Sequence, residues 1–88
     1  MVRVEWCAYV LRSLGNGRLY TGSTNDLARR LTEHDRGKTR STRHAGPYEL
    51  VYHEVCADRL EARRRELYLK SGKGRQFVND LMDKQVGD

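Results

Sequence analysis

The feature that most constrains this chain is an almost continuous apolar run near its N-terminus, over residues 4–11. The run contains Trp, Tyr and Val, and it is typical of a strand that is covered on both faces or placed centrally in a sheet. The glycines and Asn of residues 14–17 can adopt the positive φ of a tight turn. We therefore expect a β-hairpin, with residues 18–22 as the returning strand.

A helix and a basic segment follow the hairpin. One of residues 24–26 offers a side-chain N-cap for a helix over residues 27–36, and Gly37 is a natural end for it. Residues 36–47 break the periodicity and concentrate Arg and Lys among Gly, Ser and Thr. We expect this segment to be a basic loop, ordered only when a partner binds.

Residues 48–55 predict a third strand. A period of two puts Leu50, Tyr52 and Glu54 on one face of that strand. The other face would then carry the intervening residues.

The last part of the chain predicts two helices. Asp58 and Glu61 have the spacing of a capping box, at the start of a helix over residues 60–69. A Ser-Gly-Lys-Gly segment at residues 71–74 interrupts it, before a short amphipathic helix around residues 77–82. The predicted order is β-β-α-β-α-α, an α+β fold in which a small three-stranded antiparallel sheet is flanked by helices.

Size and charge narrow the function. We expect the 88 residues to form one domain with a small core. A net charge of +5 and a pI near 9.6 favour nucleic acid or another anionic partner, although ribosomal and merely soluble basic proteins share these values. Cys7 and Cys56 lack the paired spacing of a zinc site, so we expect two buried free thiols. Without a signal-peptide or membrane-span pattern, we expect a soluble, cytoplasmic protein.

Two side chains of the first helix suit phosphodiester chemistry. At about 100° per residue, Arg30 and His34 flank the buried stripe of the helix. A guanidinium can hold two phosphoryl oxygens at once, and a histidine can donate to phosphate or relay a proton near neutral pH. Each also has a structural interpretation: Arg30 as a stem covering apolar surface, and His34 as a residue favoured by the helix dipole.

Glu66, Tyr9 and Tyr20 extend this set. Glu66 shares a helix side with apolar residues, and a single carboxylate can hold a hard divalent ion together with water and phosphate. Its structural interpretation is an i,i+4 pair with Lys70. Tyr9 and Tyr20 could meet side by side across the hairpin, one hydroxyl orienting a water molecule, or could simply fill the sheet core.

The chain resembles the GIY-YIG nuclease superfamily, and specifically its short single-domain bacterial type (UvrC N-terminal-like or UPF0213-like). Residues 20–34 resemble the second half of the signature, with Tyr20-Thr21-Gly22 in place of YIG. Cys7-Ala8-Tyr9 stands in place of GIY, with only the tyrosine kept, and residues 70–77 are also similar. The resemblance covers nearly the whole chain. It implies residues 1–88 as one GIY-YIG-type domain with a three-stranded antiparallel sheet.

The resemblance also implies a metal-dependent endonuclease that hydrolyses phosphodiester bonds with one divalent ion, Mg²⁺ or Mn²⁺. By motif, Tyr9 and Tyr20 are the paired tyrosines, Arg30 contacts the phosphate, His34 is the helix histidine and Glu66 is the metal ligand. Within the family either tyrosine has been cast as general base. We place the base at Tyr20, with Tyr9 supporting it.

The expected partner is nucleic acid, DNA rather than RNA, with no membrane. Backbone contacts of basic residues give affinity with little sequence preference, so we expect structure-preferring or nonspecific cleavage. Two alternatives remain open: a nucleic-acid-binding module that no longer cuts, and a nuclease subunit that needs a protein partner. The chain could be a monomer or a weak homodimer. The candidate contacts to nucleic acid are Arg36, Lys38, Arg40, Arg43, Arg63, Lys70 and Lys73.

Overall fold

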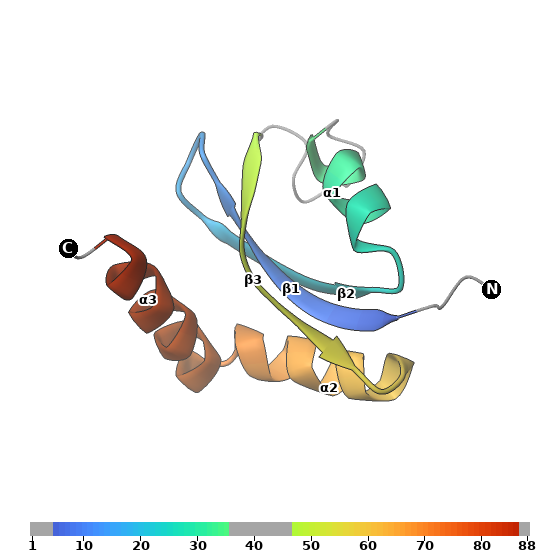
Figure 1. Cartoon of the computed structure of the whole chain (residues 1–88). Helices are drawn as coiled ribbons and strands as arrows, with labels where there is room; N and C mark the ends of the chain where they lie inside the picture. Colours follow the sequence, from blue (N-terminus) through green and yellow to red (C-terminus); the bar gives the residue numbers. More distant parts are fainter. Residues whose placement is uncertain (1–4, 36–46, 87–88) are drawn as a thin grey trace.

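The structure is a computed structural model that describes residues 5–35 and 47–86, and its elements follow the predicted order (Figure 1). The α+β class and the β-β-α-β-α-α order are therefore confirmed. The elements are β1 (Trp6–Ser13), β2 (Leu19–Thr24), α1 (Leu27–Asp35), β3 (Tyr48–Cys56), α2 (Arg59–Lys70) and α3 (Gly72–Val86).

The three strands form one antiparallel sheet in the order β2-β1-β3, so the apolar first strand is central, as predicted. Ala8 and Val10 of β1 point to the face covered by α2 and α3, where they meet the core side chains of those helices. Tyr9 points to the opposite face, where α1 lies (Figure 1). Because both faces of β1 are covered, its residues need no polar alternation.

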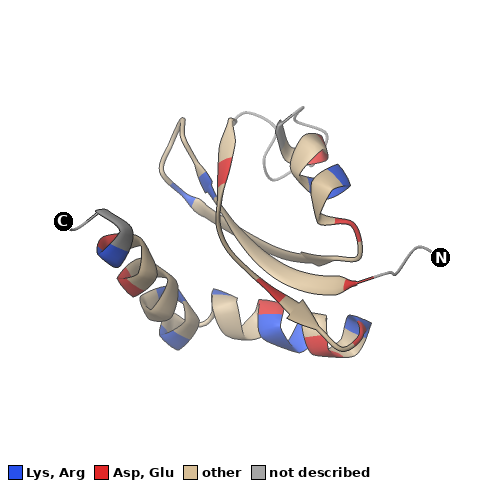
Figure 2. Cartoon of the chain, viewed as in Figure 1, with Lys and Arg blue, Asp and Glu red and all other residues tan. Residues whose placement is uncertain are grey.

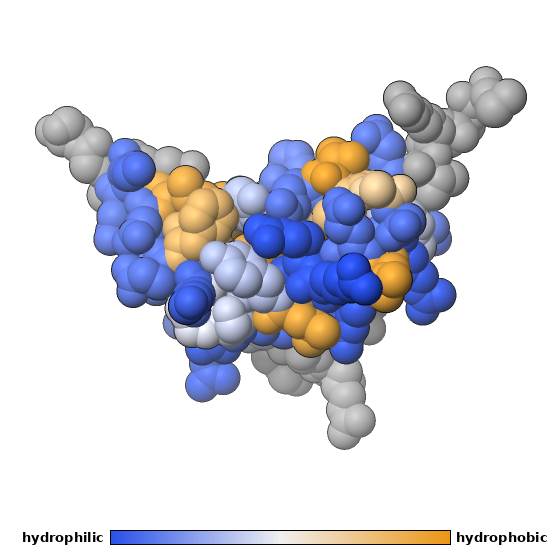
Figure 3. Space-filling view, turned by 90° about the horizontal axis from the view of Figure 1, so that it is seen from below, coloured by the Kyte–Doolittle hydropathy of each residue, from blue (hydrophilic) through white to orange (hydrophobic). Residues whose placement is uncertain are grey.

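The core lies between the sheet and the last two helices. Ala8 and Val10 pack with Leu69 of α2 and Val78 of α3, and all four are almost completely buried. The outer surface of α2 and α3 is largely hydrophilic, with separate hydrophobic patches (Figure 3). The partly buried side chains that extend the core are Leu19, Val51, Tyr52 and Met82.

The third strand departs from regular alternation. Tyr52 pairs with Val10, but Leu50, not Val51, pairs with Leu11, because the register shifts at this point. A β-bulge accounts for the extra residue. Paired residues share a face, so Leu50 and Tyr52 lie on opposite faces of the sheet, and the prediction that they share one was wrong.

Side-chain caps start the first two helices. Asp26 Oδ1 accepts the backbone N–H of Arg29 at 3.1 Å at the start of α1. Asp58 Oδ1 accepts the N–H of Glu61 at 2.8 Å, which confirms Asp58 as the N-cap of α2. Each cap satisfies an amide that has no partner inside its helix. The predicted end of the first helix at Gly37 and the basic segment 36–46 fall outside the described residues.

Only one residue separates α2 from α3, although the sequence predicted an interruption over residues 71–74. Ser71 is that residue: its N–H bonds to Tyr68 O, and its Oγ accepts the N–H of Gly74 at 3.3 Å. An added Cβ at Gly74 would overlap the Tyr68 carbonyl oxygen and lie 2.5 Å from Leu69 Cα. Gly74 therefore stays within α3, because its missing side chain lets the two helices touch.

Gly74 and Gly72 provide a matched test of this junction. We expect Gly74→Ala to lower the free energy of unfolding by about 1–3 kcal/mol, since backbone of α2 blocks the new methyl group. Gly72→Ala should be neutral or slightly stabilising, because no atom lies within 4 Å of its Cβ position. Urea denaturation of both variants checks this. Equal stability of the two would contradict the close approach.

Candidate active site

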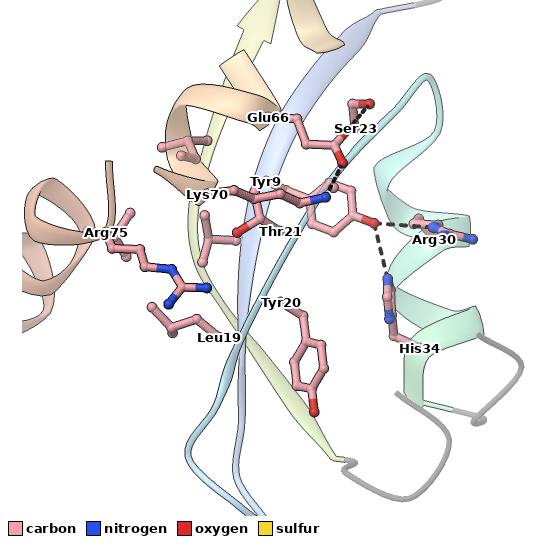
Figure 4. A pocket seen from close by; sticks show the side chains of 14 residues that line it. Tyr9, Leu19, Tyr20, Thr21, Ser23, Arg30, His34, Glu66, Lys70 and Arg75 are labelled. Carbon is pink, nitrogen blue, oxygen red and sulfur yellow. Dashed lines mark hydrogen bonds and ion pairs between the residues drawn. The ribbon is translucent and has the colours of Figure 1, made fainter. Parts of the chain in front are cut away.

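A cavity of about 580 Å³ is built around β2, the edge strand that pairs with β1 (Figure 4). Side chains from both faces of the sheet line it. Tyr9, Arg30 and His34 come from the face of α1, and Glu66 and Lys70 come from α2 on the other face. The cavity therefore collects all five core residues predicted from the sequence, Tyr20 included.

Gly22 makes this meeting of two faces possible. The register pairs Gly22 directly with Tyr9. A Cβ added at Gly22 would overlap Tyr9 Oη and lie 2.7 Å from Tyr9 Cζ, so the ring of Tyr9 passes over the bare backbone of Gly22. The hydroxyl of a side chain on the central strand thereby reaches the edge of the sheet.

The Tyr9 hydroxyl lies between two side chains of α1. Arg30 Nε donates to Tyr9 Oη at 3.2 Å, and Tyr9 Oη lies 3.1 Å from His34 Nε2 (Figure 4). Guanidinium can only donate, so Tyr9 Oη accepts from Arg30, while the direction of its bond with His34 follows the tautomer of the imidazole. Arg30 and His34 are one helical turn apart, which is why both reach one atom.

The two strongest influences on the ionisation of Tyr9 oppose each other. Burial raises the pKa of Tyr9, and this exceeds the lowering by the hydrogen bond and the charge of Arg30. The net direction is upward, so the phenol is neutral near pH 7. If Tyr9 accepts a proton, its hydroxyl must therefore give up the proton that it already carries.

Tyr20 lines the same cavity but has other contacts. Its hydroxyl accepts a 3.4 Å bond from Asn16 Nδ2, and its ring meets the edge of Tyr48, with centroids 5.5 Å apart. The ring of Tyr48 in turn lies 5.8 Å from that of His34. The two tyrosines share a cavity, while their hydroxyls have different hydrogen-bond partners.

Glu66 is a buried carboxylate with three donors. Ser23 Oγ donates to Oε1 at 2.8 Å, Lys70 Nζ donates to Oε2 at 2.7 Å, and Arg63 Nη1 lies 2.9 Å from Oε2. Burial by itself would raise the pKa of Glu66, but the bonds from Lys70, Ser23 and Arg63 outweigh it and hold the pKa below its usual value. Glu66 is therefore ionised at neutral pH. The alternative of an i,i+4 pair with Lys70 is present too, but buried and part of a larger network.

The residues around Glu66 fit a divalent cation only in part. Oxygen ligands suit Mg²⁺, which is often held by one or two carboxylates with substrate phosphates and water. Oε2 of Glu66 already attracts two cations, Lys70 and Arg63, so it is an oxygen suited to positive charge. Within residues 5–35 and 47–86, no three His, Cys, Asp or Glu side chains group around a common point. Glu66 thus fits a cation shared with a phosphate.

The predicted contacts to nucleic acid lie in different parts of the chain. Arg63 and Lys70 lie on α2 as partners of Glu66, and Lys73 is exposed on α3 outside the cavity. Basic residues are spread along α2 and α3 (Figure 2). The four candidates of the basic segment, Arg36, Lys38, Arg40 and Arg43, lie outside the described residues.

Several residues that line the cavity were not among the predicted site residues, and Ser23 and Arg75 are two of them. Ser23 follows Gly22 and, by strand alternation, points to the face of Glu66. This alternation was the signal that could have found it. Arg75 extends from α3 toward Leu19 of β2 and also lines the cavity (Figure 4). Its position depends on the angle between two helices, for which the sequence carries no comparable signal.

The two cysteines do not contribute to this chemistry. Cys7 and Cys56 are free and buried, as expected. Burial raises the pKa of both thiols, which keeps them protonated and poor as nucleophiles or metal ligands. None of the described helices is long and apolar enough to cross a membrane.

Comparison with known proteins identifies relatives of this chain. A model of the GIY-YIG catalytic domain matches residues 5–79. A UPF0213 protein of Desulfotalea psychrophila is 44% identical over 70 residues, which are 77% of this chain and 63% of that protein. A UPF0213 protein of Orgyia pseudotsugata multicapsid polyhedrosis virus is 42% identical over 82 residues, covering 91% of this chain and 78% of that one.

A solved structure is similar as well. The solution NMR structure of a UPF0213 protein from Bacillus halodurans has a TM-score of 0.53 and 32% identity, with 88% of this chain and 84% of that chain covered. This likeness supports the sheet and helix order described above. The chain spans less than two thirds of the Desulfotalea relative.

The contact between Gly22 and Tyr9 can be tested as a double-mutant cycle. We expect Gly22→Ala to lower the free energy of unfolding by about 1–3 kcal/mol, because the new methyl group displaces a buried ring. In a Tyr9→Phe background the loss should be smaller by about 0.5 kcal/mol or more, since the overlapping oxygen is gone. Urea denaturation of the four proteins measures this coupling. Strictly additive effects would contradict the overlap.

Proposed function

The chain belongs to the GIY-YIG nuclease superfamily, and we propose that it is a divalent-metal-dependent endonuclease that hydrolyses phosphodiester bonds of DNA. The observation that carries this proposal is the cavity in which a phenol, a guanidinium, an imidazole and a carboxylate face a common space. Each of these groups has a task in attack by water on phosphorus. We also propose that residues 1–88 act as one domain.

In this proposal Tyr9, rather than Tyr20, takes the proton of the attacking water. Tyr9 Oη is the phenol oxygen in contact with both Arg30 and His34. As the water oxygen bonds to phosphorus, its proton passes to Tyr9 Oη, while the phenol proton passes to His34 Nε2. This exchange never requires a free phenolate, which the raised pKa of Tyr9 would make scarce. It requires His34 Nε2 to be without a proton at the start.

Arg30 serves the phosphate. Its Nε is used by Tyr9 and its Nη1 by Glu33 at 3.2 Å, which fixes the plane of the guanidinium at the cavity wall. Further N–H groups of the same fork can donate to phosphoryl oxygens. These oxygens gain negative charge in the transition state, so a fixed cation stabilises it more than the ground state.

Glu66 would hold the divalent cation, Mg²⁺ or Mn²⁺, together with a phosphate oxygen of the substrate. When bound, such a cation neutralises charge on the scissile phosphate and on the leaving oxygen. The leaving oxygen departs as its bond to phosphorus breaks, and takes a proton from solvent. Ser23 orients Glu66 by donating to Oε1, which leaves Oε2 as the oxygen that faces positive charge.

The substrate is DNA in this proposal, cut with preference for structure or without sequence preference. Among the described residues that line the cavity, Arg30, Lys70 and Arg75 offer positive charge to a nucleic-acid backbone, and backbone contacts carry no sequence information. We propose that the protein acts in the cytoplasm as a monomer or a weak homodimer.

The variant Glu66→Gln tests the function directly. We expect it to lower metal-dependent cleavage by at least about 100-fold, because the amide keeps the bond with Ser23 but loses the charge that holds the cation. The measurement uses labelled duplex, flap, four-way-junction and single-stranded DNA, with matching RNA, in Mg²⁺, Mn²⁺ or EDTA.

Glu54→Gln is the matched control for this experiment. Glu54 also pairs with an arginine of α2, Arg65 at 2.7 Å, but it lines none of the cavity. Its cleavage rate should equal that of the wild type. Wild-type protein that binds DNA in every buffer yet cuts none would replace the nuclease with a binding module or with a subunit that needs a partner protein.

The pairing of Glu66 suggests that cation and substrate enter together. Lys70 and Arg63 both contact Oε2, so an incoming divalent ion meets two positive charges beside its ligand. A substrate phosphate attracts these two side chains and relieves that repulsion. Metal affinity should therefore be low in the free protein and should rise when DNA is bound.

Lys70→Met tests this coupling with a readout other than cleavage. We expect Mn²⁺ to bind the free variant about fivefold or more tightly than the free wild type, since one competing cation is gone. Electron paramagnetic resonance of unbound Mn²⁺ measures both dissociation constants. Lys73→Met, on exposed surface outside the cavity, should match the wild type. An unchanged affinity in Lys70→Met would refute the competition.

A further inference from the structure

We propose that a groove lined by Arg18 and Arg75 binds a second phosphate of the same nucleic-acid strand, beside the phosphate that is cleaved. This inference rests on the proposed function and adds a subsite to it. It starts from a second cavity, of about 530 Å³, formed by Arg18, Leu19 and Tyr20 of the hairpin and by Arg75 and Asn79 of α3.

The second cavity continues the first. Leu19, Tyr20 and Arg75 line both, so the two cavities adjoin at these three residues. Figure 4 shows the guanidinium of Arg75 reaching from α3 toward Leu19. A strand whose phosphate lies at Arg30 can therefore continue past Tyr20 and reach the two arginines. Aromatic rings such as that of Tyr20 suit such a path, because they can contact sugars and bases of any sequence.

Within the described part of the chain, the guanidiniums of Arg18 and Arg75 form no ion pair. Arg12, Arg30, Arg63 and Arg65 each contact a carboxylate. Neither guanidinium of this groove has a carboxylate within ion-pair distance among residues 5–35 and 47–86. Two such forks facing one groove match the geometry of a phosphate, which guanidinium binds through paired N–H groups.

Both arginines are also held in place at their backbones. The N–H of Arg18 donates to Asn16 Oδ1 at 2.8 Å, next to Gly17, whose φ of 76° shapes the turn. Arg75 stands in the first turn of α3, where its N–H bonds to Ser71 O at 2.9 Å. The close packing of Gly74 on α2 fixes that turn. Fixed backbones reduce the entropy lost when a ligand binds.

Arg29 and Arg64 give the contrast. They too are exposed, and their guanidiniums form no ion pair with a carboxylate among the described residues, but they line neither cavity. Simple exposure therefore does not distinguish Arg18 and Arg75. Their common position in a groove that continues the candidate active site does.

The test measures how salt weakens DNA binding. Each phosphate contact on duplex DNA adds about 0.9 to the slope of log Kd against log salt concentration. Using fluorescence anisotropy with a 20-base-pair duplex in EDTA, we expect the double variant of Arg18→Gln and Arg75→Gln to lower that slope by about 0.9, because the two arginines share one phosphate. Each single variant should lower the slope by part of that amount. Arg29→Gln should keep the wild-type slope. Slopes of Arg18→Gln and Arg75→Gln that equal the Arg29→Gln slope would overturn the subsite.

A second measurement locates the phosphate. The substrate is flap DNA, in which the junction fixes where the protein binds, with one uncharged methylphosphonate at successive positions. At one position beside the scissile phosphate the wild type should bind more weakly. Arg75→Gln should lose this sensitivity to methylphosphonate at that position and should respond like the wild type at the others. If Arg75→Gln keeps the wild-type sensitivity at every position, the proposal is overturned.

The two hypotheses fail in different ways. Wild type that cuts DNA in Mg²⁺ or Mn²⁺, while all slopes stay equal, refutes the subsite and leaves the nuclease. If the variants show the expected slopes but the wild type never cuts DNA, the nuclease is refuted and the groove is supported as a phosphate site. Absence of any DNA binding by the wild type overturns both.

Discussion

The passage of the Tyr9 ring across Gly22 is the contact on which the rest of the site depends. Tyr9 belongs to the central strand, where a side chain would ordinarily end inside a layer of packed residues. Because Gly22 lies beside it and carries no side chain, the phenol crosses the edge strand and meets Arg30 and His34. Glu66 reaches the same cavity from α2 on the other face of the sheet, where Ser23 of the edge strand donates to it.

Charge balance is the second constraint. A carboxylate as buried as Glu66 is costly unless donors surround it, and Ser23, Lys70 and Arg63 supply three. The network therefore stabilises the fold while it also keeps Glu66 ionised. In a chain with so small a core, one set of side chains has both a structural and a chemical task. This is why a conservative change such as Glu66→Gln is a better probe than removal of the whole side chain.

Local patterns predicted the elements, and the departures have physical causes. Apolar runs, turn residues and the Asp58 cap were enough for the order of strands and helices and for the central place of β1. The bulge that separates Leu50 from Tyr52 in β3 depends on its pairing with β1, which no single strand pattern contains. The junction at Ser71 was overestimated because two nearby glycines were interpreted as helix breakers. Gly74 instead permits close packing of α2 on α3.

The predictability of the site follows from where its residues stand along the chain. Arg30 and His34 share one helix, so helical spacing alone puts them on one side, and the structure shows both at Tyr9 Oη. Pairs such as Glu66 and Lys70 obey the same spacing. Arg75 joins the cavity only through the angle at which α3 leaves α2, a relation between elements that spacing within either helix does not encode. Residues that share an element are therefore predictable together, while groove residues supplied by a third element emerge only when the helices are packed.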